Sequence, residues 1–261
     1  MKTLYLDCGM GAAGDMLTAA LVELLPDPDA FIEEINSLGI PHVEVTREKM
    51  VKAGIQGTSI NVKIHGVEEE GHHHSHGHTH DHPHSYSHPH NSMYDIEHIM
   101  GEHLCFSEKL KEDIMAVYGL IAEAESHVHG VPVTQIHFHE VGQLDAVTDI
   151  ISVCMLMNRL NPDEVVVSPV HVGFGHIHCA HGILPVPAPA TAYILKGVPI
   201  YTGSIEGELC TPTGAALLKH FATRFGNMPV MKTQEIGYGM GKRDFGMANC
   251  VRAFWGERES E

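Results

Sequence analysis

The hydrophobic and polar positions of this chain fall into short segments whose spacing alternates between that of strands and that of helices. The apolar run at residues 3–6 predicts a strand, and the apolar residues at 16–25, after a glycine-rich turn, predict a helix. A second helix is expected to end at Gly39. Alternating apolar residues at 42–49 and 56–65, with glycines between them, predict two antiparallel strands.

The rest of the chain continues this alternation. Helices are expected at residues 93–103, 107–127, 144–160, 190–196 and 211–224, and strands at 131–138, 164–168, 230–238 and 247–255. Helices and strands alternate in places and pair locally in others, which indicates the α/β class, with α+β as the alternative. The expected architecture is a mixed sheet with flanking helices.

One segment, residues 68–92, interrupts this pattern. Ten of the 19 residues from His72 to His90 are histidine, and most of the others are Gly, Ser, Pro, Asp or Thr. Because such a composition cannot form a core, we expect a disordered loop. The chain then divides into a β-α-ββ region (1–67), the His-rich loop (68–92) and an α/β region (93–261) that we expect to pack with the first region as one domain.

The overall charge excludes some classes of partner. The 33 acidic and 16 basic residues give a formal net charge of −17, which disfavours binding to nucleic acid. No apolar run approaches the ~20 residues needed to span a bilayer, and the N-terminus does not resemble a signal peptide. We therefore expect no membrane partner and a cytoplasmic location. Six scattered cysteines without a C-x-x-C motif favour free thiols over disulfides.

The first candidate for chemistry is the stretch LDCGMGAAGDM, in which Gly9, Gly11 and Gly14 form a G-x-G-x-x-G pattern. A dinucleotide site would need an acidic residue at the end of a second strand about 20 residues further on, and a helical pattern occupies that place. Asp7 and Asp15 flank the turn and would repel a pyrophosphate unless a divalent ion lay between them. From these residues alone, a ligand-binding turn at Gly9 to Gly14 and Asp15 and a plain strand-to-helix turn are equally good interpretations, and a dinucleotide site is not favoured.

The His-rich loop is the strongest candidate for metal binding. Neutral imidazole suits Ni(II), Cu(II), Zn(II) and Co(II). Many interchangeable ligands on a flexible tether favour metal capture and transfer over catalysis, and a solvating linker is the alternative. The expected ligands are His72, His73, His74, His76, His78, His80, His82, His84, His88 and His90.

The stretch IHFHEVGQLDAVTDI predicts an ordered site. On a strand, His137 and His139 would project to one face, with Glu140 at the strand's end. Asp145 and Asp149 are four residues apart on the following helix and share a face. The set could bind Mg(II), Mn(II) or Ni(II), and Glu140 and Asp145 are the catalytic candidates. Satisfied histidines and surface acids are the alternative.

A third cluster lies in the stretch HVGFGHIHCAHG. It contains His171, His176, His178, Cys179 and His181. His176 and His178 alternate as on a strand and are further candidate metal ligands, while Cys179 offers a thiolate. Scattered loop histidines are almost as good an interpretation.

A second candidate phosphate site lies at Thr211 and Thr213, at the start of an expected helix. Free backbone N–H groups at such a terminus attract anions, although ordinary capping explains the same residues. The chain contains no G-x-x-x-x-G-K-[ST], G-x-S-x-G or H-E-x-x-H motif. A P-loop GTPase, a serine hydrolase and a zincin are therefore not indicated.

Several of these stretches occur together, in one order, in a known family. DCGMGAAGDM, the internal histidine loop, HFHEVG, PVPAPAT and TPTGAA resemble the LarC family of nickel insertion proteins, which act in the nickel-pincer cofactor pathway of lactate racemase. The resemblance runs through nearly the whole chain, and the combination is far more specific than any single motif.

The resemblance implies a CTP-dependent cyclometallase. Such an enzyme inserts Ni(II) into pyridinium-3,5-bisthiocarboxylic acid mononucleotide through two Ni–S bonds and one Ni–C bond, with Mg(II) or Mn(II) supporting the nucleotide. It also implies a C-terminal nucleotide-binding domain that we expect to be a separate partner here, and we expect a homo-oligomer. The competing hypothesis is a non-catalytic nickel or zinc storage or delivery protein. A dinucleotide oxidoreductase would need NAD or flavin binding, which we expect to be absent.

Overall fold

A mixed eight-stranded sheet forms the centre of the protein in the computed structural model, which describes residues 1–68, 93, 96, 106–136, 138, 143–179 and 181–259. The strand order is β12-β5-β1-β14-β13-β3-β2, and β4 pairs with β3. The strands are β1 (Lys2–Asp7), β2 (Val43–Lys52), β3 (Ile55–Ile64), β4 (Val67–Glu68), β5 (Glu164–Val167), β12 (Arg224–Phe225), β13 (Lys232–Met240) and β14 (Cys250–Glu257).

The central strand, β1, joins a parallel and an antiparallel part of this sheet. It pairs parallel with β5, which pairs parallel with β12, and antiparallel with β14. Beyond β14 lie the antiparallel β13 and then β3, which pairs antiparallel with β2 along its full length. Segments from both ends of the sequence therefore share one sheet.

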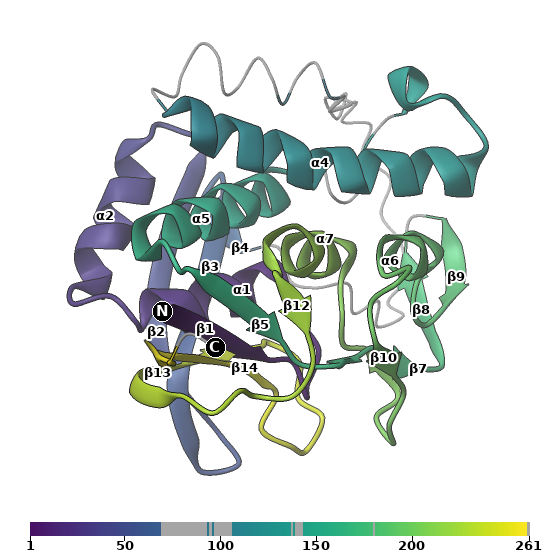
Figure 1. Ribbon diagram of the computed structural model, residues 1–261. Helices are drawn as coiled ribbons and strands as arrows, with labels where there is room; N and C mark the ends of the chain where they lie inside the picture. The colour runs from purple at the N-terminus through teal and green to yellow at the C-terminus, as the bar shows by residue number, and fades with distance from the viewer. Residues whose placement is uncertain are drawn as a thin grey trace.

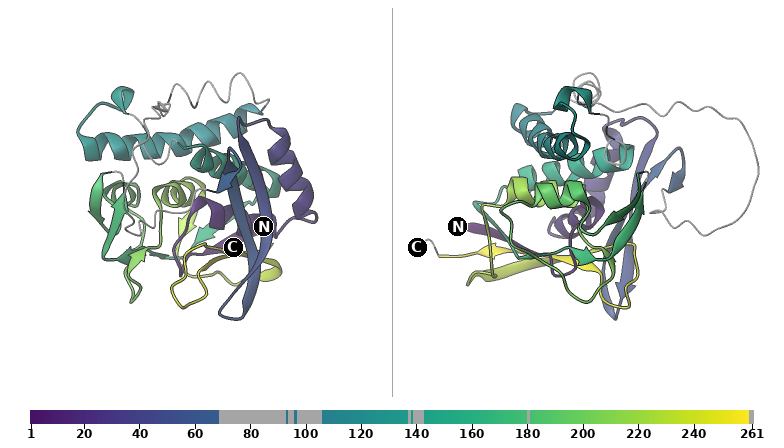
Figure 2. Two further views of the ribbon diagram at one scale, coloured as in Figure 1. Left: turned by 180° about the vertical axis from the view of Figure 1, so that it is seen from behind. Right: turned by 90° about the vertical axis from the view of Figure 1, so that its right-hand side faces the viewer.

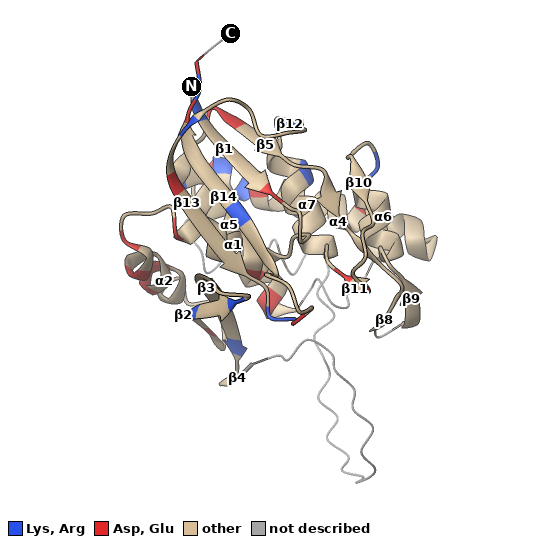
Figure 3. Cartoon of the chain, turned by 90° about the horizontal axis from the view of Figure 1, so that it is seen from below, with Lys and Arg blue, Asp and Glu red and all other residues tan. Residues whose placement is uncertain are grey.

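Helices cover one face of the sheet, as Figures 1 and 2 show, while Figure 3 looks onto the opposite face. On this face α1 packs on the sheet and against α5. The outermost helix is α4, which contacts α5, α6 and α7. The helices are α1 (Gly14–Val22), α2 (Pro28–Ser37), α4 (Glu108–His129), α5 (Leu144–Leu160), α6 (Pro189–Ile194) and α7 (Pro212–Phe221). No helix in the described part of the chain is long and apolar enough to cross a membrane.

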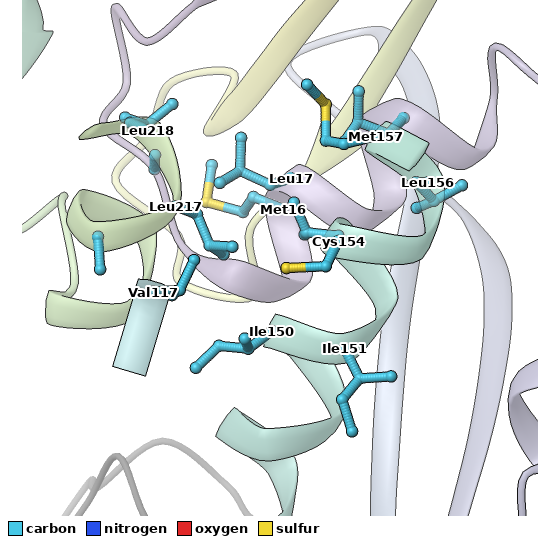
Figure 4. Close-up of a cluster of buried hydrophobic side chains, with 14 of the residues drawn as sticks. Met16, Leu17, Val117, Ile150, Ile151, Cys154, Leu156, Met157, Leu217 and Leu218 are labelled. Atoms are coloured by element: carbon cyan, nitrogen blue, oxygen red, sulfur yellow. The ribbon is translucent and has the colours of Figure 1, made fainter. Parts of the chain in front are cut away.

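The core lies between α1, α5 and α7. Figure 4 shows Met16 and Leu17 of α1 close to Cys154 of α5 and Leu217 of α7, and each of these is at most 4% exposed. Burying one large apolar side chain stabilises a fold by about 1.5–3 kcal/mol. This packing fixes the starts of α1 and α5 next to each other, which matters for the site.

Short strands form a separate edge of the molecule. Three two-stranded pairs, β6–β10, β7–β11 and β8–β9, occupy most of the segment between β5 and α7. Their bounds are β6 (Val170–His171), β7 (Gly173–Phe174), β8 (His176–Cys179), β9 (Gly182–Pro185), β10 (Ile200–Tyr201) and β11 (Gly207–Glu208).

The structure confirms the α/β class and most of the expected elements, and two expectations are wrong. The segment 131–138 does not form a strand, because residues Val133–Gln135 form a 3₁₀ turn, η1. Ser126 holds the chain after the left-handed Gly130, since its hydroxyl donates to the carbonyl of Val131 (2.5 Å). Pro132, which has no N–H, follows directly.

The expected helix 211–224 also ends early. It stops at Phe221, and the next residues join the sheet as β12. The hydroxyl of Thr223 accepts from the N–H of Val165 (3.1 Å), so the free edge of β5 takes up this segment. Most of the expected helix at 93–103 and most of the His-rich loop at 68–92 lie outside the described residues.

Candidate functional site

The glycine-rich turn after β1 is held by the chain itself. The N–H of Gly11 donates to the carbonyl of Cys8 (2.9 Å), and the N–H of Ala12 donates to the carbonyl of Leu209 (3.0 Å). Gly11 has φ +78°, and a Cβ there would lie 1.9 Å from the Leu209 carbonyl oxygen. The N–H of Gly9 donates to the carboxylate of Asp7 (3.0 Å). The group that lies closest to Gly11 is therefore the carbonyl of Leu209, in the segment before α7.

Three carboxylates meet where α1 and α5 begin. A Cβ added to Gly14 would lie 2.6 Å from the Cβ of Asp149 and 2.7 Å from its Oδ2, so only glycine lets α5 come this close. Asp149 accepts a hydrogen bond from the backbone N–H of Asp15, and Asp145 lies near enough to act on the charges of both. We call Asp15, Asp145 and Asp149 the carboxylate cluster.

The electrostatics of the carboxylate cluster oppose full ionisation. Burial raises the pKa of Asp149 well above its usual value, and the charges of Asp15 and Asp145 raise it further. Burial also raises the pKa of Asp15, while the ammonium of Lys242 lowers it in part. A cluster of this kind keeps a proton or attracts a cation, and such perturbed groups concentrate at functional sites.

Tyr118 of α4 adds a hydroxyl beside the carboxylate cluster. Its side chain is fully buried, and its hydroxyl has no hydrogen-bond partner among the described residues. Burial raises the pKa of Tyr118 well above its usual value, and Asp145 raises it further. The ring packs on Phe138 with centroids 5.7 Å apart. A ligand that reaches this hydroxyl would satisfy it.

The donors of the carboxylate cluster are oxygens, which suit Mg(II) or Mn(II). The residues that the structure describes contain no group of three or more His, Cys, Asp or Glu side chains arranged to hold a metal ion. Mg(II) is commonly held by one or two carboxylates together with phosphate oxygens. The donor set therefore fits a divalent ion that arrives with a phosphate.

The second expected phosphate site lies beside the first. The hydroxyl of Thr211 accepts from the N–H of Gly214 (3.1 Å) and caps α7. Thr213 is buried. A Cβ on Gly214 would lie 2.2 Å from the carbonyl oxygen of Ala12, so the start of α7 packs directly on the glycine-rich turn. The fold thus brings together two stretches that are almost 200 residues apart in the sequence.

The expected histidine ligands are only partly described. His176 and His178 share the exposed face of β8. His137, His139, Glu140 and the ten loop histidines lie outside the described residues. Phe138, which contacts Tyr118, is the described residue between His137 and His139.

His171 is a buried residue of β6 and not an exposed loop histidine. It is 5% exposed, stacks on Tyr201, and its Nδ1–H donates to the carbonyl of Gly9 (3.0 Å). Its Nε2 is buried and has no hydrogen-bond partner within the described ranges. This residue therefore anchors the segment 170–172 to the glycine-rich turn.

Two residues of this site were missed from the sequence. Tyr118 lies on the apolar face of α4 that Ile114, Val117 and Ile121 define. A hydroxyl among these apolar side chains could have marked it as a candidate site residue in the sequence. Lys242 follows the end of β13, and only the sheet order brings it to the carboxylate cluster.

Comparison with known proteins assigns this chain to a family. Residues 4–261 match the family model described as nickel insertion protein. No solved structure gives a significant match.

Curated relatives match the whole of this chain. A protein of Desulfitobacterium hafniense, named pyridinium-3,5-bisthiocarboxylic acid mononucleotide nickel insertion protein, is 39% identical over 261 residues, covering 100% of this chain and 60% of the relative. Proteins with the same name from Clostridium kluyveri and Geobacillus kaustophilus are 41% and 40% identical, over 99% and 98% of this chain and 63% and 60% of their own length. The chain spans about 60% of the length of these relatives, and with its family match covering almost every residue it belongs to the nickel insertion protein family.

Proposed function

We propose that this chain is the nickel-inserting part of an enzyme that converts pyridinium-3,5-bisthiocarboxylic acid mononucleotide into its nickel-pincer form. The observation that carries the proposal is the family match over residues 4–261, together with relatives named for this substrate. The reaction is that of a cyclometallase, in the lyase class. It forms two Ni–S bonds and one Ni–C bond, and the ring carbon loses a proton.

The carboxylate cluster supplies groups suited to this chemistry. A carboxylate with a raised pKa is a better proton acceptor near neutral pH than an ordinary one. Asp145, which shares a face of α5 with Asp149, is the described candidate for taking the ring proton, beside the sequence-derived candidate Glu140. A bound Mg(II) or Mn(II), held by Asp15 and Asp149, would offset the charge of a substrate phosphate.

The phosphate of the mononucleotide is expected where the glycine-rich turn meets the start of α7. Gly9, Gly14 and Asp15 come from the turn, and Thr211 and Thr213 come from α7. The positive ends of the dipoles of α1 and α7 attract a phosphate at this place. Tyr118 is placed to donate a hydrogen bond to a ligand in the carboxylate cluster.

The remaining parts of the proposal rest on the sequence. The histidines between 72 and 90 would gather Ni(II) and pass it to the ordered site. CTP would be the co-substrate, bound with the help of the polypeptide that corresponds to the rest of the relatives' length. A homo-oligomer and a cytoplasmic location complete the proposal.

Mass spectrometry of the mononucleotide product tests this function. The thiolated mononucleotide is incubated with Ni(II), CTP, Mg(II) and this chain, with and without the polypeptide matching the relatives' remaining length. We expect a nickel adduct, and we expect Asp145→Asn to slow its formation by about 10²–10⁴-fold if Asp145 takes the proton. The exposed Asp29, which pairs with Arg47, provides the matched control Asp29→Asn.

Two results would contradict the proposal. Absence of a nickel adduct under every condition would exclude insertion. A variant lacking 72–90 that no longer binds nickel, combined with no effect of the carboxylate cluster variants, would favour the storage hypothesis.

A further inference from the structure

The end of β13 and the two residues after it have the sequence GYGMGK, in which every second residue is glycine. A Cβ on Gly237 would lie 1.9 Å from the carbonyl oxygen of Ala20, and a Cβ on Gly239 would lie 1.9 Å from that of Met16. Helix α1 therefore lies directly on the backbone of β13, and Figure 3 shows it behind β13 and β14.

The last of these glycines places Lys242 beside the first turn of α1. A Cβ on Gly241 would lie 2.9 Å from Sδ of Met16, the residue that follows Asp15. Lys242 is the next residue after Gly241. Its ammonium is close enough to Asp15 and Asp149 to lower the pKa of each below what burial alone would give. The packing of α1 on β13 thus brings one fixed positive charge to the carboxylate cluster.

The ammonium of Lys242 has no hydrogen-bond or ion-pair partner in the part of the chain that the structure describes. Lys242 is exposed, so its ammonium is accessible to a ligand from solution. A second donor near the carboxylate cluster, the fully buried hydroxyl of Tyr118, also lacks a partner among the described residues. Because buried polar groups are nearly always hydrogen-bonded, such a hydroxyl indicates a ligand that brings acceptor oxygens.

The loop that carries Lys242 is held in place by two other side chains. The ammonium of Lys52, at the end of β2, donates to the backbone carbonyls of Lys242 (3.1 Å) and Arg243 (2.6 Å). The side-chain amide of Asn249, which is 4% exposed, also donates to the carbonyl of Arg243 (3.0 Å). These bonds fix the backbone at Lys242, so its side chain extends from a defined position.

Arg243 connects the same loop to the segment before α7. Its guanidinium donates to the backbone carbonyl of Glu208 (3.3 Å). Glu208 precedes Leu209, whose carbonyl lies against Gly11 of the glycine-rich turn. The loop therefore contacts both the start of α1 and the segment before α7, and the phosphate of the mononucleotide is proposed to lie between these two places.

The charge of Lys242 suits a phosphate at this position. A lysine ammonium is a compact charge with three donors, and it commonly binds phosphate. The carboxylate cluster repels a phosphate, and the ammonium offsets part of that repulsion. One positive charge does not neutralise three carboxylates, so a divalent ion or bound protons are needed there as well.

We propose that Lys242 is a substrate-binding residue whose ammonium donates a hydrogen bond to the phosphate of the mononucleotide. The inference rests on the proposed function for the identity of that ligand. Lys242 recognises the phosphate and not the pyridinium ring, so its removal weakens only the binding of ligands that carry the phosphate.

Isothermal titration calorimetry of the full chain, with Mg(II) present, tests this contact. The ligands are pyridinium-3,5-bisthiocarboxylic acid mononucleotide and the riboside that alkaline phosphatase makes from it, which differ only in the phosphate. We expect Lys242→Met to weaken binding of the mononucleotide by about 10–100-fold, because it removes a hydrogen bond between two charged groups. Binding of the riboside should change by less than about twofold.

Lys232→Met is the matched control, since Lys232 is an exposed lysine at the other end of β13. It should leave the affinities for both ligands unchanged. Circular dichroism verifies that each variant is folded. A parallel titration with CTP identifies the source of the phosphate, and we expect Lys242→Met to leave any affinity for CTP within about twofold.

Three results would overturn the inference. They are an unchanged affinity of Lys242→Met for the mononucleotide, an equal loss of affinity for the riboside, and a loss of affinity for CTP alone. Equal binding of mononucleotide and riboside by the unaltered protein, or binding of neither, would also reject it.

The outcomes separate this inference from the proposed function. A nickel adduct formed by the unaltered protein, with no effect of Lys242→Met on mononucleotide binding, leaves the function standing and rejects the role of Lys242. Phosphate-dependent binding that Lys242→Met removes, without any nickel adduct, supports the role of Lys242 and rejects insertion.

Discussion

Replacing Asp149 by asparagine tests whether the fold opposes negative charge in the carboxylate cluster. Asp149 packs against Gly14 and accepts the N–H of Asp15. Asparagine keeps the shape and an acceptor oxygen but carries no charge. Because burial, and then Asp15 and Asp145, raise the pKa of Asp149, the folded protein binds its proton more tightly than the unfolded chain does.

The sign and size of the effect follow from this difference. Stability that comes from a raised carboxyl pKa is present at low pH and is lost as the pH rises through the raised pKa. Raising the carboxyl pKa by one pH unit costs about 1.4 kcal/mol of stability above that pKa. In a chain of this size 1 kcal/mol changes Tm by about 2–4 °C. At pH 8, Asp149→Asn should therefore have a Tm about 3–6 °C above that of the unaltered protein for each pH unit by which the fold raises this pKa. Near pH 3 the two proteins should have the same Tm, because Asp149 is then protonated in both the folded and the unfolded state.

Thermal unfolding followed by circular dichroism between pH 3 and 9, with chelator present, measures the difference. Asp29→Asn is a control of opposite sign. Its hydrogen bond from Arg47 lowers the pKa of Asp29, so removing the charge should destabilise slightly at neutral pH and have no effect in acid. A Tm for Asp149→Asn that runs parallel to that of the unaltered protein, or falls below it at pH 8, would refute the reasoning.

Four further substitutions probe packing and helix capping. Tyr118→Phe removes a buried hydroxyl without a partner among the described residues and should change the free energy of unfolding by less than about 1 kcal/mol, which urea titration measures; a larger loss would mean that the hydroxyl is satisfied. Gly239→Ala places a Cβ 1.9 Å from a carbonyl oxygen of α1 and should cost about 3 kcal/mol or more, whereas Gly119→Ala, with open space in α4, should stabilise by about 0.5–1 kcal/mol in the same titration. Thr211→Val removes the cap of α7 and should cost about 1 kcal/mol by the same measurement, with no loss contradicting the capping role.

Elements with strong local signals could be predicted from the sequence. The helix α5 has the expected bounds, because Asn161 takes a left-handed conformation and Pro162 follows. The cap of α4 by Ser107 and the cap of α7 by Thr211 were equally visible. Each of these signals lies within a few residues of the boundary that it sets.

The convergence of the site could be predicted only in part. Asp145 and Asp149 share a face of one helix, so the periodicity of α5 relates them. Asp15 and Lys242 reach them through α1 and the end of β13, and no local pattern encodes the order β14-β13-β3. The prediction of a strand at 131–138 was wrong because the apolar residues match a strand, whereas Val133–Gln135 form a 3₁₀ turn after Pro132.

The glycine-rich turn shows why a motif taken alone misleads. Gly11, Gly14 and Gly214 each allow a close approach, and the approaching groups belong to this chain: the carbonyl of Leu209, the side chain of Asp149 and the carbonyl of Ala12, respectively. A phosphate at this place would stand beside carboxylates, and like charges 4 Å apart repel by about 4 kcal/mol at an effective dielectric constant of 20. Either a divalent cation or protonation must remove that repulsion. The glycines therefore act by bringing Asp15 and Asp149 together, and the phosphate that we propose depends on the cation or proton that this pair retains.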